Sequence, residues 1–229
     1  IVDGTNGIIV ITPQKRTLDK YIAEKKRYED IGKELLTLKN LRSETLDGRR
    51  IEIAANIELP EEVQSVIKYG ADGIGLFRSE YFYMNRTDLP TEEEQYKVYK
   101  DVAKKLHPRP VIIRTLDLGG DNFLSQFEVP HEMNPFLGWR AIRFCLARPE
   151  VFKVQLRAIL RASAHGNLKI MYPMISGIEE LKEANKIVEE VKDELRKEKS
   201  NFNIDIEIGA MIEIPSAALT SDILAKEAD

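Results

Sequence analysis

The stretch Val111–Leu118, with the sequence VIIRTLDL, is apolar for three residues and then carries an arginine and an aspartate. Its apolar start predicts a strand that is covered on both faces, as in a parallel sheet. Charged side chains at the end of such a strand indicate an ion-pair partner or a function, because burying an unpaired charge costs free energy. Arg114 and Asp117 both stand there. The stretch therefore predicts a buried parallel strand with polar chemistry at its carboxyl end.

Four further apolar runs flank this stretch, and residues with helical periodicity fill the gaps between them. The runs are Ile51–Ile57, Gly73–Phe77, Leu168–Ile175 and Ile204–Ile214. Strands that alternate with helices are typical of a parallel sheet under covering helices. The sequence therefore predicts an α/β protein.

Helix boundaries are marked by capping signals. Pro60 stands at a first helical position, and Gly70 follows the end of the same apolar stripe. Thr91–Glu94 has the pattern of a capping box. Ile178–Leu195 repeats apolar residues at steps of three or four, and Pro215 begins the last predicted helix.

The charged strand ends separate two possible α/β folds. Arg78 follows the second predicted strand, and Glu213 stands at the end of the fifth. A TIM-type (β/α) barrel brings the carboxyl ends of all its strands to one active-site face, whereas an open doubly wound sheet gathers ligand residues at one switch point. Charges at several strand ends favour the barrel. We expect an incomplete one, since Ile51–Asp229 holds about five βα units against the usual eight.

A long helix is predicted ahead of this region. Thr17–Asn40 carries apolar residues at steps of three, four or seven, and its other positions are mixed charges typical of a solvated face. Asp47 and Gly48 form a turn signal after it. We expect a helical linker over residues 14–48 and the barrel region over residues 49–229.

Composition excludes several classes of protein. The chain has 229 residues, of which 43% are hydrophobic and 31% charged, as in a globular protein. No apolar run approaches the ~18 residues that span a bilayer, so we expect no membrane insertion. The net charge of -4 does not indicate binding to nucleic acid, which proteins usually contact through basic surfaces. Cys145 is the single cysteine and the chain opens without a secretory signal, so we expect a cytoplasmic protein without disulfides.

Two arginines are the first candidate ligand residues. Arg78 and Arg114 should lie on neighbouring strand ends, and each guanidinium offers a rigid donor fork that matches phosphate or carboxylate oxygens. Together they could hold a small anion with two or three charges. The alternative is structural: each arginine pairs with a nearby carboxylate at the mouth of the barrel, such as Asp117.

Glu213 and Arg140 are the remaining candidates. Glu213 ends a predicted strand just before a helix, where a carboxylate either complements the helix N-terminus or binds a hard cation such as Mg²⁺. Arg140 stands at the entrance of a helix after a long loop. Its alternative role is helix capping and packing around Trp139.

Other motifs carry weaker signals. Gly73–Gly75 lies inside a strand and lacks the third glycine of a dinucleotide fingerprint. Gly119–Asp121 predicts a turn more than a phosphate-binding nest. Cys145 lies among apolar residues and is interpreted as a buried small residue rather than a nucleophile. The three histidines have no metal-ligand spacing; they are His107, His131 and His165.

Several stretches, in order along the chain, have a sequence specific enough to compare with known families. The stretches are Gly73–Met84, Leu89–Tyr96, Arg114–Asp121, Asn134–Arg143, Leu156–Ser163 and Glu207–Pro215. They closely resemble enzyme I of the sugar phosphotransferase system, the phosphoenolpyruvate–protein phosphotransferase family, and the resemblance covers most of the chain. The resemblance implies a phosphoenolpyruvate-binding (β/α) barrel that dimerises, and it makes residues 1–13 similar to the tail of the family's phosphohistidine domain.

The resemblance also assigns roles to the candidate residues. It places Arg78 and Arg114 at the phosphate and carboxylate of phosphoenolpyruvate, Arg140 near the transferring phosphoryl group, and Glu213 on Mg²⁺. In this family the enzyme passes phosphoryl from phosphoenolpyruvate through its own histidine to the phosphocarrier protein HPr. The family's phosphoacceptor histidine segment, its second magnesium ligand and its cysteine acid have no counterpart in these 229 residues. We therefore expect no catalytic residue in this chain and no phosphoryl transfer by the chain alone.

Three other interpretations remain open from the sequence. Pyruvate phosphate dikinase and phosphoenolpyruvate synthase share the barrel. A citrate-lyase-like barrel also has a strand that ends in a similar Ile-Glu-x-Pro run, here Ile212–Pro215. A non-catalytic fragment for interaction or dimerisation would keep anion affinity without turnover.

Overall fold

The structure is a computed structural model that describes residues 1–84, 86, 88–119 and 138–229. The chain divides into two compact units, residues 1–51 with 68–70 and residues 52–67 with 71–229. Each unit is described by itself.

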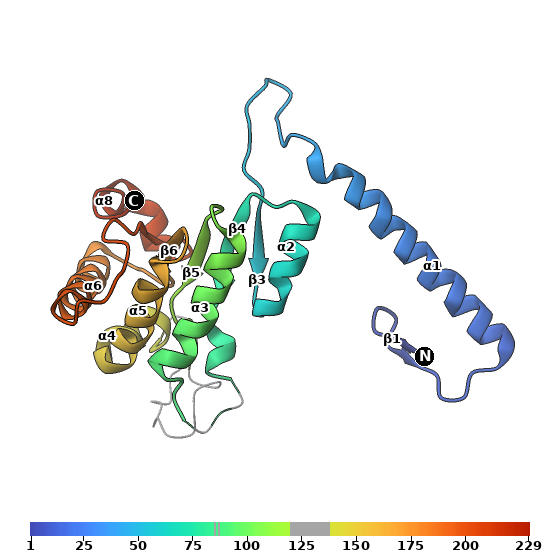
Figure 1. Ribbon diagram of the computed structural model, residues 1–229, viewed down its shortest axis with the longest axis horizontal. Helices are drawn as coiled ribbons and strands as arrows, with labels where there is room; N and C mark the ends of the chain where they lie inside the picture. Colours follow the sequence, from blue (N-terminus) through green and yellow to red (C-terminus); the bar gives the residue numbers. More distant parts are fainter. Residues whose placement is uncertain (85, 87, 120–137) are drawn as a thin grey trace. The chain divides into compact units, whose positions relative to one another are not determined.

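The first unit combines a small hairpin with one long helix (Figure 1). Strands β1 (Val2–Asp3) and β2 (Ile8–Ile9) pair antiparallel. Gly7 precedes β2 with a φ of +66°, a conformation that glycine adopts without strain. Helix α1 (Lys15–Thr37) continues into the 3₁₀ turn η1 (Leu38–Asn40), which confirms the predicted long helix.

The second unit is built on a parallel sheet of five strands in the order β3-β4-β5-β6-β7. The strands are β3 (Ala54–Ile57), β4 (Gly73–Arg78), β5 (Val111–Arg114), β6 (Leu168–Tyr172) and β7 (Ile208–Ala210). All five predicted strands are present, and the α/β class is confirmed. These five strands form one open row, and the described residues contain no closed barrel.

Helices connect successive strands and cover the sheet. They are η2 (Pro60–Glu62), α2 (Val63–Tyr69), η3 (Glu80–Phe82), α3 (Glu92–Leu106), α4 (Ala141–Ala147), α5 (Pro149–Ser163), α6 (Ile178–Lys197), α7 (Pro215–Leu219) and α8 (Ser221–Leu224). Helices α3, α5 and α6 pack side by side, and α3 and α5 lie in front of the strands in Figure 1. The predicted capping box is present, because Thr91 Oγ1 accepts from Glu94 N while Glu94 accepts from Thr91 N.

The core lies between the helices and one face of the sheet. In β5, Val111 and Ile113 are fully buried whereas Ile112 and Arg114 are partly exposed. This alternation differs from the expectation of equal cover on both faces, since among the described residues the helices leave one face only partly covered. The largest fully buried side chains are Tyr99, Tyr172, Phe77, Phe144 and Phe152. Burying such a ring typically stabilises the fold by about 1.5–3 kcal/mol.

Among the described residues, no helix combines the length and the apolar character that are needed to cross a lipid bilayer.

Candidate anion-binding site

The carboxyl ends of β4 and β5 bring two of the predicted site residues together. Arg78 and Arg114 are the last residues of their strands and are directly paired in the sheet register. Paired positions on adjacent strands lie about 4.8 Å apart in the direction of the hydrogen bonds. The two backbones therefore place both arginines at one edge of the sheet.

Arg114 is held by two carboxylates. Its Nη2 donates to Glu80 Oε1 at 2.9 Å, and its Nη1 lies 2.8 Å from Asp117 Oδ2. The second oxygen of Asp117 accepts from Arg140 Nη2 at 2.9 Å. Only 13% of the Arg114 side chain is exposed. Asp117 thus joins two of the predicted site arginines, so the ion pairs expected under the structural interpretation exist.

Arg78 has a weaker attachment. Its Nη2 donates to Glu58 Oε2 at 2.7 Å, but 42% of its side chain is exposed. An exposed ion pair is worth little because water screens it. The Arg78 guanidinium can therefore leave Glu58 for a better acceptor at small cost.

All three site arginines have a buried donor for which the described residues offer no acceptor. The Nε atoms of Arg78, Arg114 and Arg140 are each inaccessible to solvent and make no hydrogen bond to the part of the chain that the structure describes. A guanidinium Nε always carries a hydrogen, and an unpaired buried donor costs free energy. An anion that accepts from these groups would recover that cost.

The environment of Glu80 acts on the pKa of its carboxyl in opposing directions. Burial raises the pKa of this carboxyl, the nearby Arg114 opposes the shift, and the Asp117 carboxylate adds to it. Arg114 and Arg140 supply two positive charges, and Glu80 and Asp117 supply two negative ones, so the cluster is formally neutral. Its carboxylates orient the arginines and also compete with any bound anion.

Arg140 reaches the cluster from the start of α4. It is the residue before Ala141, and its side chain makes no capping hydrogen bond. A Cβ at Gly119 would lie 3.1 Å from Arg140 Cβ, so glycine there permits the close approach. The predicted packing of Trp139 is also present, with its ring 5.1 Å from that of Phe144.

Glu213 lies three residues beyond β7, whose last residue is Ala210. Its Oε1 accepts from the backbone nitrogen of Met174 at 2.8 Å rather than from helix α7. Met174 has a φ of +58°, which turns its peptide away from the regular strand.

The fit of Mg²⁺ to these residues is partial. Mg²⁺ usually takes one or two protein carboxylates and completes its shell with water and substrate oxygens. The exposed Glu213 suits one such position. No cluster of three or more His, Cys, Asp or Glu side chains with the arrangement of a metal site occurs among the described residues.

The weaker motifs behave as expected where they are described. Gly73–Gly75 lies inside β4. Cys145 is fully buried, which raises the pKa of its thiol. His165 contacts Tyr96, with 3.1 Å between Nε2 and the phenol oxygen, and His107 follows the end of α3. Gly120, Asp121, His131 and 134–137 lie outside the described residues.

Sequence reasoning missed Glu80, Ser79 and Gln155. Glu80 and Ser79 stand next to Arg78 in the chain, and this adjacency was the available signal. Gln155 lies on α5 between Phe152 and Ile159, at helical spacing from both, so a polar residue interrupts an apolar stripe.

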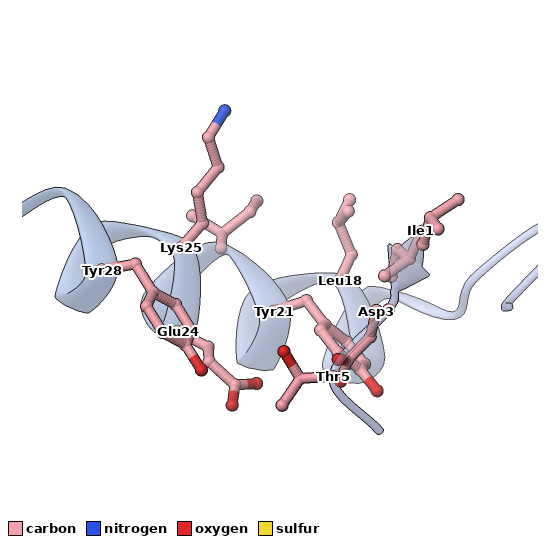
Figure 2. A pocket seen from close by; sticks show the side chains of 11 residues that line it. Ile1, Asp3, Thr5, Leu18, Tyr21, Glu24, Lys25 and Tyr28 are labelled. Atoms are coloured by element: carbon pink, nitrogen blue, oxygen red, sulfur yellow. The ribbon is translucent and has the colours of Figure 1, made fainter. Parts of the chain in front are cut away.

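A separate pocket of about 490 Å³ lies in the first unit, between the hairpin and α1 (Figure 2). Figure 2 shows Leu18, Tyr21 and Tyr28 of α1 along it, with Asp3 and Thr5 of the hairpin region. It contains none of the predicted site residues.

The fold and site define an α/β protein with an arginine-rich site at the carboxyl ends of parallel strands. The family model for the PEP-binding domain of PEP-utilising enzymes matches residues 33–229, and the chain belongs to this family. This confirms the resemblance found in the sequence.

Curated relatives match along the whole chain. Phosphoenolpyruvate-protein phosphotransferases of Staphylococcus aureus (strain MSSA476), Priestia megaterium and Staphylococcus carnosus (strain TM300) are 48%, 46% and 46% identical to it over 229 residues. The chain spans 40% of the length of each of these relatives.

Proposed function

We propose that this chain binds phosphoenolpyruvate at the edge formed by β4 and β5, as part of a phosphoenolpyruvate-protein phosphotransferase. The observation that carries the proposal is the register pairing of Arg78 with Arg114, each with a buried Nε–H that has no acceptor among the described residues. Family membership and the names of the relatives support the choice of ligand over a citrate-lyase-like substrate.

The ligand's chemistry suits this arrangement. Phosphoenolpyruvate carries a phosphate and a carboxylate, and guanidinium groups bind both kinds of anion with charge-assisted hydrogen bonds. We assign Arg78, Arg114 and Arg140 to these contacts. Asp117 and Glu80 hold Arg114 in place beforehand, so less side-chain entropy is lost when the ligand binds. Phosphoryl transfer depends mainly on such positioning and on neutralising phosphoryl oxygens.

We assign Glu213 as a protein ligand of Mg²⁺. When bound, Mg²⁺ would neutralise part of the charge on the phosphoryl oxygens. The backbone N–H of Met174 fixes one oxygen of Glu213 and leaves the other for the cation. This single carboxylate needs the substrate or other groups to complete the site.

The wider assignments belong to the same proposal. We propose that residues 49–229 form the N-terminal part of a TIM-type (β/α) barrel, residues 14–48 a helical linker and residues 1–13 the tail of a phosphohistidine domain. The strand order β3-β4-β5-β6-β7 supports the barrel, since it contains no reversal of the kind that marks a doubly wound sheet. A cytoplasmic homodimer that acts on phosphoenolpyruvate and HPr completes the proposal.

Calorimetric titration tests the binding function directly. Phosphoenolpyruvate should bind the chain, and Mg²⁺ should strengthen binding if Glu213 holds the cation. Pyruvate, which lacks the phosphate, should bind more weakly, and inorganic phosphate serves as the second control. Equal, weak affinity for all three ligands would contradict the proposal.

A phosphoryl-transfer assay separates binding from catalysis. We expect no pyruvate release from these 229 residues with phosphoenolpyruvate, Mg²⁺ and HPr, because none of His107, His131 and His165 stands in a phosphoacceptor motif. Release above a no-protein control would contradict this expectation.

A further inference from the structure

The side chain of Gln155 connects helix α5 to two strand ends. It is 1% exposed and lies on the apolar face of α5. Its Oε1 accepts from Leu116 N at 2.9 Å, and its Nε2 donates to Ser79 Oγ at 2.9 Å and to Tyr99 OH at 3.2 Å. A buried amide with a partner at each polar atom is a fixed structural element rather than an accident of packing.

The hydrogen bonds around Gln155 have one consistent direction. Ser79 Oγ donates to the carbonyl oxygen of Arg114 at 2.8 Å, so its single hydrogen is used there. Tyr99 OH donates to Gln95 Oε1 at 3.3 Å in the same way. Both hydroxyls must therefore accept from the Gln155 amide. A flipped amide would point its NH₂ group at the N–H of Leu116, which excludes that orientation.

Two of the residues that Gln155 contacts stand next to site residues in the chain. Ser79 follows Arg78 directly, and Leu116 lies between Arg114 and Asp117 in the chain. One helix side chain thus holds the hydroxyl of the residue after β4 and the backbone just after β5. Its link to Arg114 passes through the Ser79 hydroxyl.

We propose that Gln155 is a positioning residue for the anion-binding site. It acts through Ser79 on the backbone of Arg114 and through Leu116 on the segment that carries Asp117. The Arg114 guanidinium then keeps one arrangement before the ligand binds. This inference rests on the proposed binding of phosphoenolpyruvate, and it adds a residue that does not itself touch the ligand.

The first test compares ligand affinities of two single variants and their double variant. Gln155→Met keeps the side-chain length but removes every hydrogen bond, and Ser79→Ala removes only the hydroxyl link. Each should weaken phosphoenolpyruvate binding about tenfold, which corresponds to the loss of one or two hydrogen bonds. The double variant should bind no more than slightly weaker than Gln155→Met, because both changes break the same connection.

A matched control separates positioning from general destabilisation. Ile159 lies one turn further along α5 and is fully buried, and Ile159→Val removes one methyl group without removing a hydrogen-bonding group. It should lower the melting temperature and leave the dissociation constant unchanged. Wild-type affinity in Gln155→Met, or fully additive effects in the double variant, would overturn the inference.

A second measurement does not require a ligand. The Nε–H of Arg114 is buried, so its NMR signal should be protected from exchange with water. Gln155→Met and the milder Ser79→Ala should shift or broaden this signal. The guanidinium signals of Arg109, whose Nη1 donates to Ala71 O, should stay unchanged. An unmoved Arg114 signal in both variants would overturn the inference. Absence of phosphoenolpyruvate binding in the unmodified chain would instead overturn the proposed function, and the Arg114 signal would still decide the role of Gln155.

Discussion

Arg114 serves as a structural ion-pair partner and as a proposed ligand-binding residue at once. Two largely buried carboxylates, Glu80 and Asp117, hold both of its terminal nitrogens. Removing one member of a buried pair leaves an uncompensated charge, which is strongly destabilising. The same fixed geometry would prepare the guanidinium for an anion, so the structural and functional interpretations of Arg114 are compatible.

Replacing Arg114 with lysine should separate charge from geometry. Arg114→Lys keeps one positive charge but cannot contact two carboxylates and a ligand together. We expect phosphoenolpyruvate affinity to fall by about 1–3 kcal/mol, the usual range for a charge-assisted hydrogen bond. Calorimetry measures the change. Arg196→Lys, at an exposed pair with Asp193, is the control that should bind normally; wild-type affinity in Arg114→Lys would rule out its assignment as a ligand.

Glu94 gives a prediction about pH. The backbone N–H and hydroxyl of Thr91, followed by Arg86, lower the pKa of the Glu94 carboxyl to about 2. A carboxyl whose folded-state pKa is depressed stabilises the fold above its unfolded pKa, and this contribution is lost as the pH falls through the folded value. The stability difference between the wild type and Glu94→Gln should therefore be constant near neutral pH and shrink between about pH 4.5 and pH 2. Urea unfolding at a series of pH values measures it, and a difference independent of pH would contradict the assignment.

Residues that stand where a strand ends could be predicted, whereas residues that act through a network could not. Arg78 and Arg114 interrupt apolar runs, and this contrast is visible in the sequence. Gln155 resembles an ordinary polar helix residue until the fold places it behind Ser79. The partners of Arg114 depend on side-chain geometry, which spacing along the chain does not determine.

At the scale of the elements, two strand glycines show how closely neighbouring segments pack. A Cβ at Gly73 would lie 2.5 Å from the carbonyl oxygen of Pro110, just before β5, whereas a Cβ at Gly209 in β7 would meet nothing within 4 Å. Gly73 in β4 therefore permits the close approach of adjacent backbone and is not part of a nucleotide fingerprint.

Alanine substitutions test this packing argument. Gly73→Ala should lower the free energy of unfolding by about 1–3 kcal/mol, the usual cost of overpacking a core. Gly209→Ala should leave it nearly unchanged, because the space is open. Urea denaturation of both variants gives the comparison. Equal stabilities would show that β4 can shift to accept the methyl group.

The existence and order of the elements followed from periodicity, but their ends did not. The predicted strand Val111–Leu118 ends at Arg114 in the structure, and Ile204–Ile214 contracts to Ile208–Ala210. Apolar residues beyond the strand ends, such as Leu116 and Leu118, are buried without belonging to the sheet. Strand length depends on whether a neighbour offers hydrogen bonds, and sequence periodicity reports only burial.

At the scale of the whole molecule, exposed apolar side chains and sheet edges could contact another chain. Strands β3 and β7 each have a single sheet neighbour among the described residues. No residue of α1 is buried, and Ile22 and Leu35 are 56% and 51% exposed. Unpaired strand edges and exposed apolar patches both favour contact with another chain.

We therefore expect the 229-residue chain to form dimers or larger species at concentrations of about 100 μM, where such surfaces associate. Light scattering over a dilution series measures the mass. The variant Ile22→Glu/Leu35→Glu places charges on α1 and leaves the sheet untouched. A monomeric variant would assign the contact to the helix, and an unchanged mass would assign it to the sheet edges.

An exposed ion pair on the same helix, Lys33 with Asp30, offers a control, since Lys33→Gln alters the charge without altering the apolar area. A wild-type chain that stays monomeric at every concentration would contradict both routes and leave the proposed homodimer without support from these surfaces.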